Sequence, residues 1–377
     1  MTLPDSDQAD QPKSPSLVAS KSPAVSVSQV QGVTIRAAVQ SDDDARDAYV
    51  RSHPEGSFFH LAGWGSTVQN VMKHPRRDLL AMRGTEIVGL LPLSLCRGLR
   101  SRNLISVPYG VYGGPIAADS AIETSLYQAA ELMALECKAG RLELRTRHEP
   151  RFEAKDLVPS DLYATFAKTL PDSVEGVLAG MPKKARADAR KARKDHGLEL
   201  IEGREYLSDL VRLFHNNKRQ LGSPGLPMSW FQALLDVFQE AATIHVVRRE
   251  GVVLCAVMSF LYEDQVLAYY SGSGDGVDRS YKASGFLYMA LQEWCVDHGY
   301  RVFDFGRSRK DSGAFDFKRR QGFEPVDLQY RYRLLRDKGL PSLTPSNPKT
   351  KRIRETWSRL PLWLTTRLST PASRLLP

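Results

Sequence analysis

The spacing of apolar residues changes repeatedly along the chain, and each change predicts a boundary between a strand and a helix. Short apolar runs predict strands at 33–36, 78–83, 87–95 and 103–109. Between the second and third runs, Gly84-Thr85-Glu86 indicates a hairpin turn. Apolar residues three and four apart over 121–138 predict a helix that ends near Gly140, before a further strand at 141–145.

The same order of elements returns later in the chain. The pattern predicts helices at 207–220, 229–241, 284–298 and 314–320, and strands at 243–249, 252–262, 265–270, 301–305 and 326–335. Glu250-Gly251 indicates the matching hairpin, and Gly299 ends the matching long helix. We infer a tandem duplication. A hairpin-rich sheet with one strand–helix–strand crossover is typical of a mixed α/β (α+β) layer and not of a doubly wound sheet.

Length and composition narrow the class of protein. The 377 residues, 42% hydrophobic and 25% charged, exclude collagen-like, wholly disordered and disulfide-framework proteins. We predict a disordered tail at 1–30, domains at 31–170 and 171–335, and a basic C-terminal arm at 336–377. No apolar run reaches 18 residues and no CxxC pair occurs, which indicates a cytoplasmic protein, at most peripheral to the inner membrane.

The net charge of +9 is confined to two segments of the chain. Residues 183–194 carry +6 and residues 336–377 carry +7, which leaves −4 for the remainder. A local surplus of this kind indicates contact with an anionic partner at particular places and not along the whole molecule.

The first basic segment, 183–194, predicts a helix with Pro182 in its first turn. Helical spacing places Arg186, Arg190 and Lys194 on one face and three alanines on another. One interpretation is a solvated basic helix. The other is a clamp for phosphate groups, which guanidinium groups bind in a two-pronged geometry, with the alanine face lying close to its own domain.

A second cluster of polar residues follows the strand predicted at 301–305. Asp304 stands at the end of that strand, Gly306 and Arg307 follow, and Lys318 lies on the next short helix. Ends of strands in open α/β sheets are common ligand sites. An alternative interpretation makes Asp304 and Lys318 a partly buried structural pair. No hydrolase elbow, P-loop or zinc-protease motif occurs, and the eight histidines have no metal-ligand spacing, so no metal is expected.

Several short motifs occur in a distinctive order. They are Phe58-Phe59-His60 with Trp64, Pro108-Tyr109-Gly110 with Gly113-Gly114-Pro115, the basic helix before His196-Gly197, Phe303-Asp304-Phe305-Gly306, and Phe317-Lys318 with Gly322-Phe323. This combination resembles FemAB-type aminoacyl transferases and related GNAT-like acetyltransferases. The C-terminal segments 356–362 and 375–377 resemble the branch of that family linked to exosortase (PEP-CTERM) systems.

The resemblance implies two GNAT-like domains that move an acyl or aminoacyl group from an activated ester or thioester to an amine. It implies a place for Lys318 at the reaction centre, where Asp304 would take a proton or hold the loop. The donor would be acyl-CoA or aminoacyl-tRNA. The acceptor would be a lipid- or nucleotide-linked glycan or peptide precursor of the cell envelope or of an exopolysaccharide. Candidate binding residues are Arg186, Arg190, Lys194, Lys282, Arg307 and Tyr109.

Two departures from the family bear on the donor. The chain lacks the pair of long helices that some Fem ligases insert between their domains, which counts against tRNA. The GNAT pyrophosphate signature is not intact, although Tyr281, Lys282 and Gly285 stand where a loop enters a predicted helix and would suit a phosphate.

Other functions remain open at the level of sequence. One alternative is a non-catalytic GNAT-like protein that holds an anionic glycan precursor at the inner membrane face. Another is an RNA-binding module, although the chain has no RNP or KH signature. The C-terminal arm mixes leucines and Trp363 with arginines, while Pro361 and Pro371 are predicted to break any long helix. The arm either packs on the first domain or anchors the protein on anionic lipid.

Overall fold

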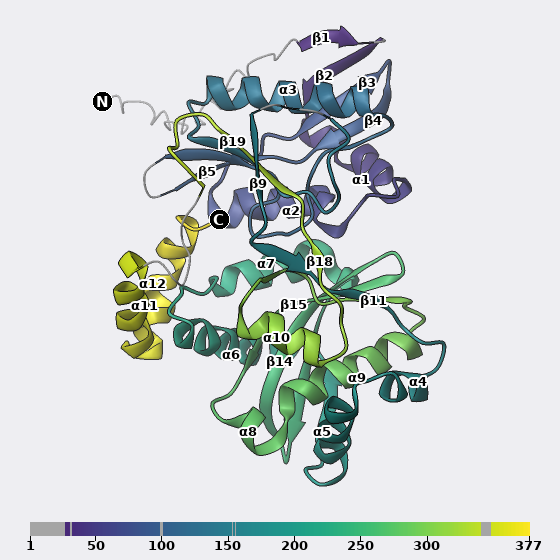
Figure 1. The fold of residues 1–377 in the computed structure, drawn as a ribbon, viewed down its shortest axis with the longest axis vertical. Helices are drawn as coiled ribbons and strands as arrows, with labels where there is room; N and C mark the ends of the chain where they lie inside the picture. Colours follow the sequence, from purple (N-terminus) through teal and green to yellow (C-terminus); the bar gives the residue numbers. More distant parts are fainter. Residues whose placement is uncertain (1–26, 31, 99–100, 153, 155, 341–347) are drawn as a thin grey trace, which may run out of the picture.

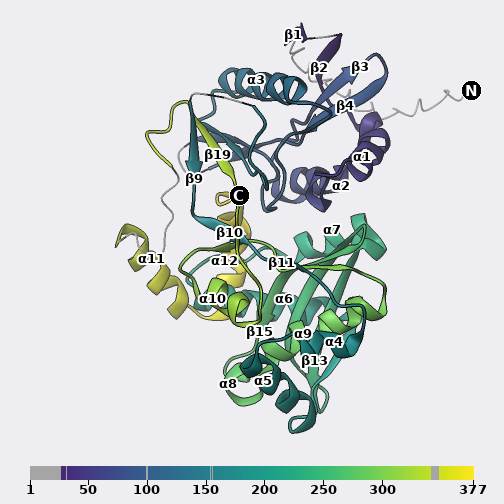
Figure 2. The same cartoon turned by 45° about the vertical axis from the view of Figure 1, so that its right-hand side comes forward.

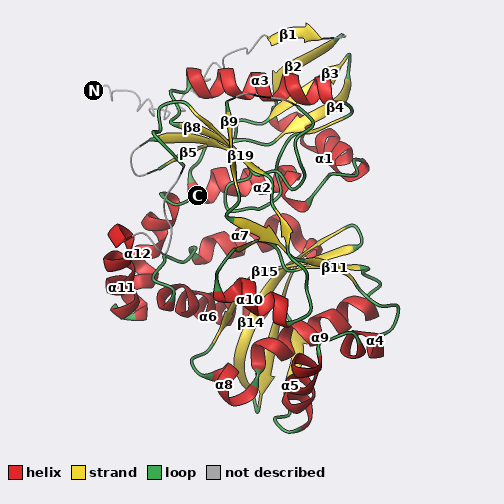
Figure 3. Ribbon diagram, in the orientation of Figure 1, coloured by secondary structure: helices red, strands yellow, loops and turns green. Residues whose placement is uncertain are grey.

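The computed structural model describes residues 27–30, 32–98, 101–152, 154, 156–340 and 348–377. These residues form two halves, one above the other in Figure 1, and Figure 2 shows the same division after a turn of 45°. Helices cover sheets in both halves (Figure 3), which confirms the predicted mixed α/β fold. Of the predicted disordered tail, residues 1–26 lie outside the described residues, and Val27–Val30 form strand β1.

Two five-stranded sheets build the first half. One has the order β1 (Val27–Val30), β2 (Val33–Ala37), β3 (Leu79–Arg83), β4 (Glu86–Leu91), β7 (Ile116–Ala117). The other has the order β5 (Ser94–Arg97), β6 (Arg102–Ile105), β8 (Arg141–Leu144), β19 (Tyr330–Leu334), β9 (Leu157–Ser160). The run predicted at 87–95 divides between the two sheets, because Pro92 has no N–H with which to continue the ladder.

A six-stranded sheet builds the second half. Its order is β11 (Ala167–Thr169), β16 (Val302–Asp304), β15 (Gln265–Ser273), β14 (Val252–Tyr262), β13 (Ala242–Arg249), β12 (Glu199–Glu202). A three-stranded sheet adds β17 (Ser308–Arg309), β10 (Tyr163–Thr165), β18 (Val326–Asp327). Glu250 and Gly251 both have positive φ and turn the chain from β13 into β14, as the hairpin prediction requires.

The two halves exchange strands. β19, near the end of the chain, pairs antiparallel with β8 and β9 of the first half. β11, which precedes residue 171, pairs antiparallel with β16 of the second half. The predicted boundary between 31–170 and 171–335 therefore divides the sequence but not the sheets. On each side of it, one strand pairs with a sheet of the other half.

Helices flank the sheets on several sides. They are α1 (Asp43–Ser52), α2 (Ala62–Thr67), α3 (Ser120–Glu136), α4 (Val174–Ala179), α5 (Lys183–Lys194), α6 (Leu207–Gln220), α7 (Met228–Phe238), α8 (Val277–Tyr281), α9 (Ala283–Asp297), α10 (Gly313–Arg320), α11 (Pro348–Arg359), α12 (Leu362–Arg374). α4, α5 and α9 pack together on one face of the six-stranded sheet, and α6 and α7 pack on the face toward the first half.

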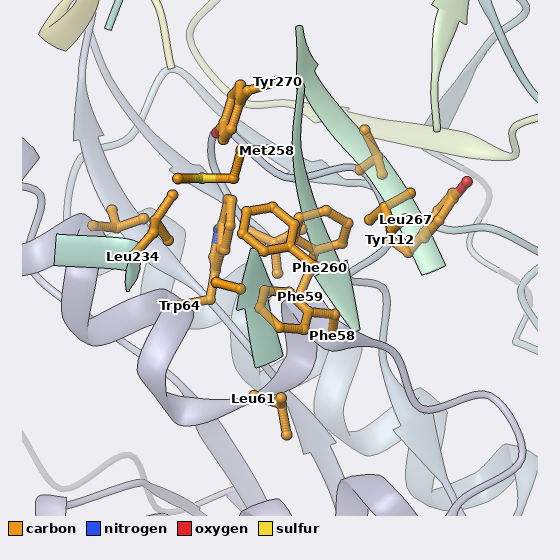
Figure 4. Packing of buried hydrophobic residues seen from close by; sticks show 14 of the residues in the cluster. Phe58, Phe59, Leu61, Trp64, Tyr112, Leu234, Met258, Phe260, Leu267 and Tyr270 are labelled. Carbon is orange, nitrogen blue, oxygen red and sulfur yellow. The ribbon is translucent and has the colours of Figure 1, made fainter. Parts of the chain in front are cut away.

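Aromatic side chains fill the junction between the halves (Figure 4). Phe58 of the first half stacks on Phe260 of β14 with a centroid distance of 4.4 Å, and Trp64 meets Trp230 of α7 edge to face at 5.4 Å. These rings are buried. Since a fully buried side chain of this size contributes about 1.5–3 kcal/mol, the junction is part of the hydrophobic core and not a hinge.

Helices α5 and α12 test two predictions, one on a buried alanine face and one on a proline that would break a helix. Helix α5 buries its alanine face, Ala185, Ala189 and Ala192, against its own domain as expected. Pro371 does not break α12, because the carbonyl that loses a partner is that of Arg367, a residue exposed to water. None of the helices in the described ranges has the length and apolar character needed to span a bilayer.

Candidate active site

A fork between β15 and β16 forms the centre of the candidate site. The two strands pair in parallel over three residues, from Gln265 opposite Val302 to Leu267 opposite Asp304. β15 then continues to Ser273, whereas the chain after Asp304 turns away at Gly306, which has a φ of +63°. Beyond Leu267, the only strand among the described residues that pairs with β15 is β14, so within this part of the chain one edge of β15 is unpaired beside the end of β16.

Asp304 is a fully buried carboxylate at this fork. It accepts hydrogen bonds from the Tyr112 hydroxyl, at 2.9 Å and 3.1 Å, and from the Gly306 amide at 2.6 Å. Burial raises the pKa of the Asp304 carboxyl, and the nearby positive charges of Arg147 and Lys318 oppose that rise. The carboxylate is therefore held as an acceptor that takes up a proton more readily than an exposed aspartate does.

Lys318 lies on α10, which Ser312 begins by accepting a hydrogen bond from the Phe315 amide at 3.2 Å. The Lys318 ammonium donates to the carbonyls of Phe305 at 2.7 Å and Gly306 at 3.0 Å. Burial lowers the pKa of Lys318 to about 7, so the amine is able to gain or lose a proton near neutral pH.

The alternative interpretation, in which Asp304 and Lys318 form a structural pair, does not hold as a direct ion pair. No ion pair within 4.0 Å joins the two side chains in the described residues. The lysine instead bonds the backbone of the turn that begins one residue after Asp304. Lys318 therefore acts on the position of the carboxylate through the turn, and its charge acts on the carboxylate at longer range.

The first half completes the site with Tyr112, which comes from the loop 109–115. Its hydroxyl contacts both Asp304 and the hydroxyl of Thr165. Neutral His60 holds the same loop by donating from Nε2 to the Gly114 carbonyl at 2.9 Å, since burial lowers the pKa of His60 to about 4. Sequence reasoning marked this loop for its glycines and did not identify the tyrosine that reaches the second half.

Arg147 lies beside Tyr112, with its guanidinium carbon 4.8 Å from the centre of the tyrosine ring. A cavity of about 60 Å³ opens here, lined by both residues and by Arg151. Arg151 is neutralised by Glu123 at 2.9 Å and by Glu55 at 3.8 Å. Arg147, in contrast, has no hydrogen bond or ion pair to any described residue, so an anionic ligand group would meet it without displacing a partner.

Arg307 and Tyr109 lie close to the fork but are already engaged. Arg307 donates to the Tyr330 hydroxyl at 3.3 Å and lies 4.5 Å from the ring centre of Tyr163. The Tyr109 carbonyl accepts from the Tyr269 hydroxyl at 2.7 Å, and the Tyr109 hydroxyl donates to a carbonyl of α12. In this structure both predicted binding residues hold the surroundings of the fork together.

The remaining predicted binding residues gather elsewhere, at the end of the second half drawn lowest in Figure 1. Arg190 and Lys194 are exposed on α5, and Arg186 donates to the carbonyl of Ala179 at 3.1 Å. Lys282 joins α8 to α9 in a left-handed conformation. Beyond the end of α5, His196 contacts Tyr281 at the end of α8 with a distance of 5.5 Å between ring centres. The structure does not bring these cations into contact with Asp304 or Lys318.

Comparison with known proteins supports the fold. Residues 181–319 match the acetyltransferase (GNAT) domain family model. The structure of FemX is similar at a TM-score of 0.61 and 15% identity, covering 83% of this chain and 98% of that one. The structure of L-PGS from Bacillus licheniformis is similar at a TM-score of 0.51 and 14% identity, covering 88% and 97%. No curated protein sequence matches the chain. At these identities the structural likeness shows a shared fold.

Proposed function

We propose that the chain transfers an acyl or aminoacyl group from an activated ester or thioester to an amine. The observation that carries this proposal is the meeting of Asp304, Tyr112 and Lys318 at the fork between β15 and β16. Two of these residues lie within the segment that matches the acetyltransferase model. The likeness of fold to FemX agrees with this reaction class.

In the proposed reaction, the amine nitrogen attacks the carbonyl carbon of the donor. As the C–N bond forms, the nitrogen gives a proton to the Tyr112 oxygen, and Tyr112 gives its own proton to Asp304. The bond from the carbonyl carbon to the ester oxygen or thioester sulfur breaks. The proton then returns from Asp304 through the Tyr112 hydroxyl to the leaving group, which balances the step. The raised pKa of Asp304 suits it to accept that proton.

Lys318 is proposed as the residue that positions the turn after Asp304. Its ammonium holds the carbonyls of Phe305 and Gly306, so the Gly306 amide stays directed at the carboxylate. The third N–H of the ammonium is directed at the Arg307 carbonyl at 3.4 Å. Direct contact between Lys318 and the developing oxyanion would therefore require one of these three hydrogen bonds to be exchanged for it.

The acceptor we propose is an amine on a lipid- or nucleotide-linked precursor of the cell envelope or of an exopolysaccharide, at the cytoplasmic face of the membrane. The unpaired Arg147 beside Tyr112 supports an acceptor that carries a phosphate or carboxylate. The resemblance of 356–362 and 375–377 to the exosortase-linked branch supports the exopolysaccharide systems as its source.

The donor we propose is acyl-CoA or aminoacyl-tRNA, held through its phosphates by α5. The exposed Arg190 and Lys194 support this contact. At the start of α9, the Asp278 carboxylate already accepts from the Ser284 amide at 2.6 Å. A phosphate beside Lys282 would meet that negative charge, which favours α5 as the main contact.

The test is a transfer assay on the purified chain with acetyl-CoA and, separately, with aminoacyl-tRNA, using amine-bearing nucleotide-linked precursors. Product is read by mass spectrometry and precursor binding by calorimetry. Tyr112→Phe should reduce transfer at least tenfold with little change in binding, and Tyr127→Phe on α3 should behave as wild type. Full transfer by Tyr112→Phe contradicts the proton path. Binding without transfer by the wild-type chain, with either donor, favours the non-catalytic binding protein.

A further inference from the structure

Helix α12 buries residues that usually face water and exposes residues that usually face a core. Its buried side chains are Thr365, Ser369 and Ser373, which lie four residues apart on one face. Trp363 is 67% exposed and Leu368 is 41% exposed. At 100° per residue, these two flank the side of the helix opposite to the buried hydroxyls.

Polar contacts hold the hydroxyl face of α12 against both halves of the molecule. In the second half, Ser369 accepts from the Gly225 amide at 3.0 Å. In the first half, Tyr109 donates to the Ser373 carbonyl at 3.1 Å, and Arg145 donates to the carbonyl of Pro377 at 3.2 Å. The helix is thereby fixed with its apolar side outward, and α11 and α12 lie at the edge of the molecule in Figure 1.

The outward apolar residues are concentrated in this arm. Among the described residues, the large hydrophobic side chains exposed between 348 and 377 are Ile353, Trp363, Leu368, Leu375 and Leu376. An amphipathic helix that only covered a protein core would place such residues inward. A tryptophan at a surface is typical of a membrane interface, because the indole has an apolar body and one polar N–H.

Basic residues surround this apolar side. Arg352, Arg359 and Arg367 are exposed on α11 and α12 and form no ion pair with a described residue. Residues 336–377 together carry +7, whereas the molecule apart from the arm and α5 carries −4. The charge of the arm is therefore complementary to an anionic surface and opposite to that of the body on which it rests.

We propose that α11 and α12 dock the protein on the surface of an anionic lipid bilayer. Trp363, Leu368 and Leu375 enter the boundary between headgroups and acyl chains, and Arg359 and Arg367 bind lipid phosphates. The docked face is the one shown here, so docking needs no rearrangement of the arm. The inference is independent of the transfer reaction, since it rests on the arm alone.

Vesicle flotation with the full chain tests the inference, using phosphatidylcholine vesicles with and without phosphatidylglycerol. The wild-type chain should float with the anionic vesicles and not with the neutral ones. The double variant W363A/L368A should bind them at least tenfold more weakly. L132A/L135A is the matched control, because it removes two exposed leucines from α3 in the first half. R359A/R367A should weaken binding and reduce its dependence on salt.

Three results would overturn the inference. The first is a wild-type chain that stays unbound with anionic vesicles. The second is a loss of binding by the control L132A/L135A as large as that of W363A/L368A. The third is a wild-type dimer in light scattering that W363A/L368A dissociates, which would mean that the face binds a second copy of the protein. Circular dichroism of each variant establishes that the chain is folded before flotation.

Discussion

Matching seven-residue stretches end a central strand in each half, but only one of them carries the candidate proton acceptor. Arg141–Arg147 reads Arg-Leu-Glu-Leu-Arg-Thr-Arg, and Arg301–Arg307 reads Arg-Val-Phe-Asp-Phe-Gly-Arg. In each half the strand pairs in parallel with a hairpin strand on one side. On the other side it pairs antiparallel with a strand from across the predicted boundary. Leu144 stands in the place of Asp304.

The two stretches have the same strand neighbours but differ in the polar groups that they place at the strand end. In the second half, Gly306 adopts a positive φ and its amide satisfies Asp304. In the first half, Leu144 is buried in the core, and the buried charges are Glu143 and Arg145, paired at 2.8 Å. The two halves thus share the strand and its neighbours, while the first half has no carboxylate at the matching position and supplies Tyr112 to the second half instead.

The largest expected effect is on the transfer rate, and it comes from removing the carboxylate that distinguishes the end of β16 from the matching strand of the first half. Asp304→Asn preserves shape and removes the proton acceptor, so the transfer rate should fall by about 10²–10⁴-fold. Asp316→Asn, on the exposed side of α10, should retain the wild-type rate. Single-turnover kinetics measure both. A rate within a factor of three of wild type for Asp304→Asn would place the proton acceptor elsewhere.

The two equivalent arginines should respond differently to the same change. Arg147→Met removes the unpaired cation of the cavity and should weaken acceptor binding by about 10–100-fold, the value of a hydrogen bond to a charged group. Its free energy of unfolding should stay within about 0.5 kcal/mol of wild type. Arg307→Met removes ring contacts and should instead lower the free energy of unfolding by about 1 kcal/mol. Calorimetry measures acceptor binding and urea titration measures the free energy of unfolding of both variants. Equal responses of Arg147→Met and Arg307→Met would contradict the proposed difference between the two arginines.

Lys318→Met should lower the free energy of unfolding by about 1–3 kcal/mol at neutral pH, because the buried carbonyls of Phe305 and Gly306 lose their donor. Arg319→Ala, exposed on the same helix, is the matched control. Urea unfolding followed by fluorescence gives both values. If Lys318→Met is as stable as the control, the ammonium does not hold the turn.

The stability contribution of Lys318 should also depend on pH. Burial lowers its pKa to about 7, whereas an unfolded lysine has a pKa of about 10.4. Between these values the unfolded chain binds more protons, so the wild-type free energy of unfolding should rise with pH relative to Lys318→Met. Below about pH 7 the difference between the two should be constant. A difference that stays flat from neutral pH to about pH 10 would contradict the lowered pKa.

An effect smaller than that of Lys318→Met is expected at the turn. Gly306→Ala should lower the free energy of unfolding by about 1–2 kcal/mol, since a side chain disfavours a φ of +63°. A Cβ at Gly306 would have only ordinary contacts, the nearest at 3.5 Å from Tyr269, so the effect comes from the backbone. Gly313→Ala, where a Cβ meets nothing within 4 Å, should not destabilise the fold. Equal free energies of unfolding for the two variants would contradict the explanation based on the positive φ of Gly306.

Much of the candidate site was predictable from local sequence, and the rest was not. The position of Asp304 at a strand end and the buried alanine face of α5 followed from spacing alone. Arg147 was missed, although the alignment of the two seven-residue stretches places it opposite Arg307. The contact of Tyr112 with Asp304 joins residues 192 positions apart, which no local pattern encodes.

The sequence by itself determined the two hairpins, the long helices, the similar order of the main elements in the two halves and the two basic segments, because periodicity and turn residues act within a few positions. Only the tertiary structure decided that β11 and β19 are exchanged between the halves. It also decided that Lys318 bonds a backbone turn and not Asp304, and that α12 turns Trp363 outward. These outcomes depend on which buried surfaces and hydrogen-bonding groups meet across the whole chain, and that choice is made by packing between distant segments.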